Sequence, residues 1–88
     1  MRFRKKPVEV EAVQINDILN SSLVEWPEWV REAYATDVMR LGVGEVSIKT
    51  LEGIMTGQSR DMLVKGIKGE LYCVREDIWV ETYEYVGE

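Results

Sequence analysis

The chain has 88 residues, of which 45% are hydrophobic and 31% are charged, and its formal net charge at pH 7 is −5. This length accommodates one small domain, and this balance of apolar and charged residues excludes the composition typical of intrinsic disorder. The negative charge argues against binding to nucleic acid through phosphate neutralisation, because such binding requires a basic face. We therefore expect a single folded domain over residues 1–88 with no nucleic-acid partner.

Cysteine content and hydropathy indicate the cellular compartment. Cys73 is the only cysteine, so no intramolecular disulfide can form and a reducing environment suits the chain. The longest stretches without a charged residue, Ile18–Val24 and Gly53–Ser59, have 7 residues each, whereas a membrane-spanning helix needs about 20 apolar residues. The sequence thus predicts a soluble, cytoplasmic protein with no membrane partner.

The first residues combine a basic cluster with the start of a strand. Alternating apolar and charged residues over Val8–Ala12 predict a strand with one buried face, and a change of phase then predicts a bend near Ala12 and Val13. Basic residues crowd the start of the chain and acidic residues its end. Either the basic arm contacts a phosphate or an acidic partner, or it is solvated charge that the acidic end partly neutralises. The residues concerned are Arg2, Arg4, Lys5 and Lys6 at the start and Glu76, Asp77, Glu81, Glu84 and Glu88 at the end.

One helix is predicted in the first half of the chain. Residues 16–22 are rich in turn-forming types, and Ser22 with Glu25 matches a capping box. Proline suits the first helical position, so we expect the regular helix to begin at Pro27 and to end near Thr36. Apolar residues recur there at spacings of three and four and form one stripe. The stripe contains Trp26, Trp29, Val30, Ala33 and Tyr34.

The remaining sequence has the pattern of short antiparallel strands. Glycine accepts the positive φ that tight turns require, and glycines separate runs of β-branched and aromatic residues. We expect hairpins around Gly53 and Gly69, a short strand before them and a last strand near the C-terminus. The predicted strand segments are 39–41, 46–51, 54–56, 62–67, 71–74 and 82–86, whereas 76–80 fits a helical turn or a strand.

These elements together predict an α+β fold. No internal repeat, linker or low-complexity tract interrupts the chain. We expect a small single domain with a five- or six-stranded, mainly antiparallel sheet, or a partly open barrel, and one helix over residues 27–36 packed on it. The helix has to cover one sheet face, because its apolar stripe needs a partner.

Several segments of the chain resemble one known family. The sequences RKKPVEVEAVQ near the start and KGIKGELY late in the chain, taken together, are similar to small proteins common in tailed-bacteriophage and prophage genomes. The chain departs from the family pattern twice, with Ser59-Arg60-Asp61 in place of Pro-Gly-Asp and Tyr72-Cys73-Val74 in place of Tyr-Pro-Cys. The resemblance implies a phage protein in the cytoplasm of a bacterial host and implies no particular chemistry. The matching segments are 4–14, 27–29, 48–53, 64–72 and 82–84.

The residue types present limit the possible chemistry. The chain has no histidine, so a Ser-His-Asp or Cys-His arrangement is excluded and the commonest metal ligand is missing. We interpret Cys73 as a small core side chain, and no second cysteine supports a metal site. Paired carboxylates hydrolyse glycosides or hold a divalent cation where they share a cleft, but here we interpret them as solvent-facing charge. We predict no catalytic residue, no metal and no cofactor.

The three tryptophans are the main candidates for a contact surface. A domain of this size fully buries one or two side chains of about 200 Å² each, and a tryptophan left partly exposed marks an interface. Our first hypothesis is a non-enzymatic phage accessory protein that binds a protein partner, either itself as a homodimer or a host factor. It would cover the partner through an aromatic patch and an exposed sheet edge. The candidate residues are Trp26, Trp29 and Trp79.

Two alternatives come from other classes. The first is a sponge that sequesters a small anionic, nucleotide-like host ligand between an aromatic face and Lys65 and Lys68, which flank the late turn. These lysines also fit an exposed, merely solubilising hairpin tip. Titration with nucleotides separates a sponge from a protein-binding module, because a sponge gains stability on saturation. The second alternative, a carboxylate-dependent enzyme, has the least support.

Overall fold

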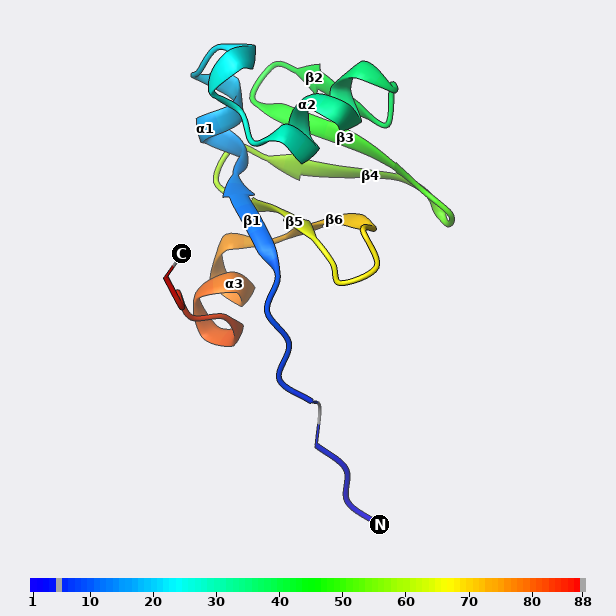
Figure 1. Ribbon diagram of the computed structural model, residues 1–88, viewed down its shortest axis with the longest axis vertical. Helices are drawn as coiled ribbons and strands as arrows, with labels where there is room; N and C mark the ends of the chain where they lie inside the picture. The colour runs from blue at the N-terminus through cyan, green and yellow to red at the C-terminus, as the bar shows by residue number, and fades with distance from the viewer. Residues whose placement is uncertain (5, 88) are drawn as a thin grey trace.

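The computed structural model describes residues 1–4 and 6–87 and has an α+β fold with six strands in two antiparallel sheets (Figure 1). Sheet A has the strand order β1-β5-β6 and sheet B the order β2-β3-β4. The α+β class and the antiparallel strands are as predicted, but the strands form two sheets that do not close into a barrel. In chain order the elements are β1 (Glu11–Gln14), α1 (Ile15–Leu19), the 3₁₀ helix η1 (Leu23–Glu25), α2 (Glu28–Ala35), β2 (Met39–Gly42), β3 (Glu45–Thr50), β4 (Gly53–Gln58), β5 (Met62–Lys65), β6 (Leu71–Val74) and α3 (Glu76–Thr82).

The core lies between sheet A, sheet B and the helices α1 and α2. Sheet A contributes the row formed by Val13, Leu63 and Cys73, which are cross-strand neighbours. Because side chains alternate along a strand, Ala12, Val64 and their neighbours face the other side of sheet A. The core cluster consists of Ile15, Ile18, Trp26, Val30, Ala33, Met39, Val46, Ile48 and Leu63.

The predicted helix is confirmed to within a residue at each end, since α2 spans Glu28–Ala35. Pro27 is its N-cap, and Trp26 has the extended conformation that a following proline favours. The Ser22–Glu25 capping box therefore serves the separate helix η1, where the Glu25 carboxylate accepts hydrogen bonds from the Ser22 amide at 3.1 Å and hydroxyl at 2.9 Å. These bonds hold the pKa of Glu25 below its usual value.

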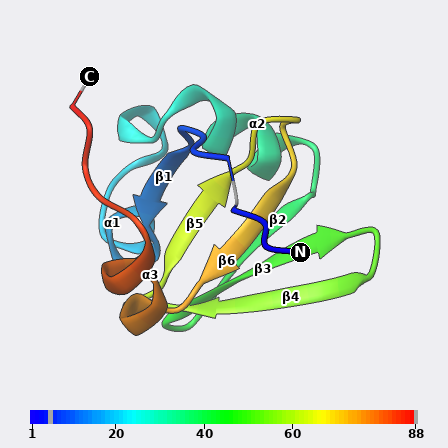
Figure 2. The same cartoon turned by 90° about the horizontal axis from the view of Figure 1, so that it is seen from below.

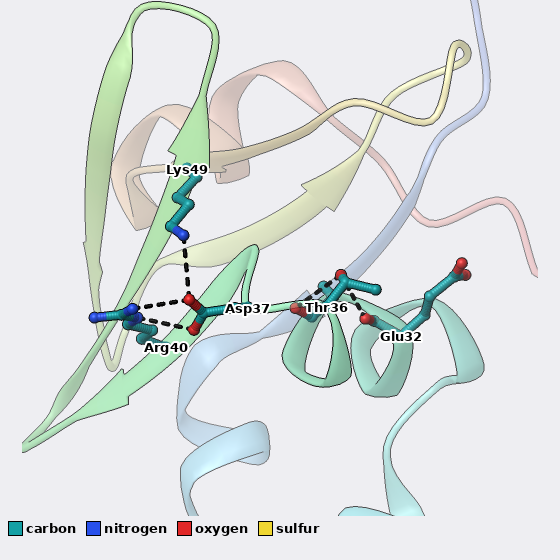
Figure 3. A network of polar contacts seen from close by, with 6 residues as sticks. Glu32, Thr36, Asp37, Arg40 and Lys49 are labelled. Carbon is teal, nitrogen blue, oxygen red and sulfur yellow. Dashed lines mark hydrogen bonds and ion pairs between the residues drawn. The ribbon is translucent and has the colours of Figure 1, made fainter.

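Asp37 ties the end of α2 to sheet B. It has φ of 63°, a conformation that most L-residues avoid but aspartate tolerates. Its carboxylate accepts two hydrogen bonds from Arg40, at 2.9 and 2.8 Å, and one from Lys49 at 3.2 Å (Figure 3). This bond holds the side chain of Lys49, a residue of β3, on Asp37.

The start of the chain differs from the prediction. The strand begins at Glu11 rather than Val8, because β5 ends at Lys65, the partner of Glu11, and offers no residue beyond it. Its pairing with β5 continues unbroken through Ala12 and Val13, so the predicted bend is absent. Residues 16–22, predicted as a turn, contain most of α1, whose Ile15 and Ile18 are buried.

The end of the chain also differs. Residues 76–80, which fitted either a helical turn or a strand, belong to the helix α3. Residues 83–87 form no strand, so the strand predicted over 82–86 is wrong. Figures 1 and 2 show α3 on the side of sheet A that faces away from sheet B. Val64 is fully buried on that side. Residues 1–4 and 6–87 thus contain α1, η1 and α3 in addition to the predicted helix α2.

Both predicted hairpins are confirmed. Strands β3 and β4 pair from Glu45↔Gln58 to Thr50↔Gly53 around a two-residue loop, and β5 and β6 pair from Met62↔Val74 to Lys65↔Leu71. Gly69 has φ of 83° in the second turn, as expected of a turn glycine.

Candidate functional site

An open groove with a volume of about 470 Å³ lies between the edge strand β1 and the helix α3. Its floor comes from β1 and from Met62 of β5, and its wall comes from α3, which contributes Glu76, Trp79 and Val80. Charged side chains close one end. The lining residues are Ala12, Val13, Gln14, Asp17, Arg60, Met62, Glu76, Trp79 and Val80.

The strand β1, which lines this groove, has one free edge. β1 pairs with β5 on one side only and is the last strand of sheet A on the other. The Ile15 amide donates to the Asp61 carbonyl at 2.9 Å, and hydrogen-bonded pairs alternate along an antiparallel ladder. The backbone groups of Ala12 and Gln14 consequently point away from β5. Such an edge is a template for pairing with another strand.

The wall of the groove is an aromatic stack. Trp79 is half-buried and packs on Tyr83, with ring centroids 4.2 Å apart and ring planes inclined by 16°. Burial and a hydrogen bond with Tyr83 raise the pKa of Tyr72, on β6, to about 12. Val80 beside the stack is 71% exposed. The groove therefore offers a fixed aromatic face and an exposed aliphatic residue to an occupant.

Asp61 positions α3 against the sheet. Its carboxylate accepts hydrogen bonds from the amide of Gln58 at 2.9 Å and from the amide of Glu76, the first residue of α3, at 3.3 Å. Because the Asp61 carbonyl also accepts the amide of Ile15, the first residue of α1, this one residue connects α1, the loop after β4 and α3. From the sequence we interpreted carboxylates such as Asp61 as solvent-facing charge, so its role in holding α3 was missed.

The charged end of the groove is acidic. Arg60 and Glu76 form an ion pair at 3.3 Å, in which the Arg60 side chain is largely exposed and the Glu76 side chain is half-buried. Asp17 adds a second carboxylate, and among the described residues it forms no ion pair. Two carboxylates thus face one guanidinium, which favours a basic occupant.

The structure brings one of the five predicted binding residues to the groove. Trp79 lines it, whereas Trp26 is buried in the core with its indole N–H donating to the Ile18 carbonyl at 3.1 Å. Trp29 is half-buried and packs against the core. Lys65, at the end of β5, is half-buried and Lys68, in the turn after it, is exposed; neither lines the groove. The β1 and α1 residues of the groove were not predicted, because nothing local distinguishes them.

Cys73 lies in the sheet near this site without facing the groove. Its burial raises the pKa of the thiol to about 11, helped by the negative charge of Asp61. The Cys73 amide donates to the Met55 sulfur at 3.1 Å, which joins β6 to β4.

Across residues 1–4 and 6–87, no group of three or more His, Cys, Asp or Glu residues is arranged to hold a metal ion. The helices in this part of the chain are too short and too polar to cross a bilayer. Comparison with family models, curated proteins and solved structures found no match to the chain.

Proposed function

We propose that this chain is a non-enzymatic accessory protein that binds an extended segment of a protein partner in the groove between β1 and α3. The observation that carries this proposal is the free edge of β1 lying beside the half-buried Trp79. The partner is another copy of the chain or a host factor. The resemblance to tailed-phage proteins supports a phage origin, and the action we propose is to cover the bound segment.

The binding mode is strand addition. The outward backbone groups of Ala12 and Gln14 hydrogen-bond to the occupant and supply affinity, while alternate side chains of the occupant enter the groove. Those side chains meet Met62 and Trp79, so apolar residues suit these positions. Asp17 and Glu76 add a preference for nearby positive charge.

Fluorescence anisotropy with a labelled peptide tests this proposal. The probe is the capped peptide Lys-Val-Lys-Val-Lys-Val, and its counterpart has Glu in place of Lys. We expect the basic peptide to bind the full chain at least about ten-fold more tightly than the acidic one, because the groove is acidic. Trp79→Ala should weaken binding at least about ten-fold, whereas Trp79→Phe keeps an aromatic wall and most of the affinity.

The matched control is Tyr85→Ala, which removes an aromatic side chain that is 84% exposed and does not line the groove. Its affinity for the peptide should equal that of the unchanged chain, with far-UV circular dichroism confirming that each variant is folded. Absence of peptide binding, or equal losses in Trp79→Ala and Tyr85→Ala, contradicts the proposal.

A further inference from the structure

We propose that the groove is filled by residues 6–10 of a second copy of this chain, so that two copies exchange their N-terminal arms. This inference rests on the proposed function and names the occupant. The arm is residues 1–10, and Figure 1 shows its described residues extending away from the body of the molecule. Its described residues are exposed up to Glu9, and Val8 is 50% exposed.

The arm has the sequence of a strand without the partner that a strand needs. The alternation of Val8, Glu9, Val10 and Glu11 is the pattern of a half-buried strand, yet pairing starts only at Glu11 because β5 ends opposite it. No other strand of the described chain lies beside residues 6–10. A strand from another molecule would supply the missing pairing.

Side-chain parity places the apolar residues of the arm on the groove side. Side chains alternate between the two faces of a strand, so in an extended arm Val8 and Val10 lie on the same face as Ala12 and Gln14, which line the groove. If two β1 edges pair antiparallel about a two-fold axis, even-numbered residues of one copy lie opposite even-numbered residues of the other. Val8 and Val10 of each copy then enter the groove of the other, beside Trp79.

Charge also favours a second copy as the occupant. Four of the 11 basic residues but one of the 16 acidic residues lie in the arm, which leaves 7 basic and 15 acidic residues in the body. None of the ion pairs within the described residues involves Arg2, Arg4 or Lys6. The arm of one copy therefore carries free positive charge toward an acidic body, and the acidic end of the groove receives it.

On the opposite face of the joined sheet, Glu9 and Glu11 of the two copies approach each other. Like charges at such positions are destabilising. Lys65 is the cross-strand neighbour of Glu11 and adds a positive charge to this face. Lys65 thereby has a role in this arrangement, different from the ligand contact that the sequence suggested.

Sedimentation equilibrium of the full chain, from about 1 µM to about 500 µM at low salt, tests the inference. We expect a dimer whose dissociation constant rises with salt concentration. Val8→Asp should weaken it at least about ten-fold, because a carboxylate would enter an apolar and acidic groove. Val43→Asp makes the same change at a fully exposed turn position, outside the arm and the groove, and should leave the dimer unchanged.

The two proposals fail in different ways. A chain that stays monomeric over the whole range but binds the Lys-Val peptide overturns arm exchange and leaves the proposed function standing. A dimer that Val8→Asp does not weaken, or that both variants weaken equally, also overturns arm exchange. A monomer that does not bind the peptide contradicts both.

Discussion

The carboxylate of Asp61 accepts a hydrogen bond from the backbone amide of Glu76 at 3.3 Å, which joins the loop after β4 to the first residue of α3. The same carboxylate accepts the Gln58 amide at 2.9 Å. Helix amides at an N-terminus lack partners within the helix, so an acceptor from elsewhere in the chain fixes where the helix starts. The wall of the groove therefore depends on a residue that does not line it.

Replacing Asp61 should destabilise the fold and loosen the groove together. Asp61→Ala leaves two backbone amides without their acceptor, and we expect it to lower the free energy of unfolding by about 1–3 kcal/mol in urea titrations. Asp61→Asn retains one acceptor oxygen and should lose less. If both variants unfold at the same urea concentration as the unchanged chain, Asp61 does not hold α3 in place.

The Asp37 network should make stability depend on pH in the acid range. Hydrogen bonds from Arg40, and then from Lys49, hold the pKa of Asp37 well below its ordinary 3.8. A carboxyl group whose pKa is lower in the folded state than in the unfolded state stabilises the fold. This contribution is complete at a pH above the unfolded-state pKa, and it is lost as the pH falls from there through the folded-state pKa.

The melting temperature of the unchanged chain should therefore exceed that of Asp37→Asn by a constant margin above about pH 5, and the margin should shrink between about pH 5 and pH 2. Asparagine tolerates the same positive φ, so backbone strain cancels in this comparison. A margin that grows on acidification would contradict the network.

Gly57 has a steric requirement that its place in a strand does not reveal. A Cβ added there would lie 2.5 Å from Ile15 Cδ1 and 2.8 Å from Cys73 Sγ, and the Ile15 side chain is fully buried. Gly57→Ala should cost about 1–3 kcal/mol of unfolding free energy, measured by urea denaturation. Gly42→Ala is the control, because its new Cβ meets the movable Glu45 side chain at 3.0 Å, and its cost should be clearly smaller.

Cys73 should react slowly with thiol reagents in the folded chain. Burial raises its pKa from 9.0 to about 11, which reduces the thiolate fraction near pH 8 by about 100-fold, and the thiolate is the reactive species. Alkylation with iodoacetamide at pH 8 should accelerate by at least this factor when urea unfolds the chain. Equal rates in the folded and unfolded chain would contradict the burial of this thiol.

The hairpins and α2 were predictable because their signals are local. A glycine at a turn position was enough to predict the hairpin around Gly69, and the spacing of apolar residues such as Val30 and Ala33 was enough to predict α2. The helix α3 was ambiguous, since Trp79 and Val80 also suit a strand, and the deciding contact comes from Asp61, 15 residues earlier. Tyr83 and Tyr85 alternate like strand residues, but Tyr83 stacks on Trp79 instead.

Other parts depended on long-range pairing. The turn-forming residues of 16–22 obscured the helical spacing of Ile15 and Ile18, both of which are buried by the fold. The division into two sheets and the groove arise from packing between distant strands, which no local pattern specifies. For the site, the sequence therefore predicted an aromatic contact residue and an exposed sheet edge. It did not predict that Trp79 and β1 line the same groove.

The most direct test of groove binding is a ¹H–¹⁵N correlation spectrum of the labelled chain during titration with the Lys-Val peptide. The three indole N–H signals act as separate reporters, because Trp79 lines the groove whereas the Trp26 indole is bonded to Ile18 inside the core. We predict that the Trp79 indole and the amides of Ala12–Gln14 shift while the Trp26 indole stays in place. Shifts confined to sheet B, or a saturating titration that leaves Trp79 and β1 unmoved, would contradict the proposed groove.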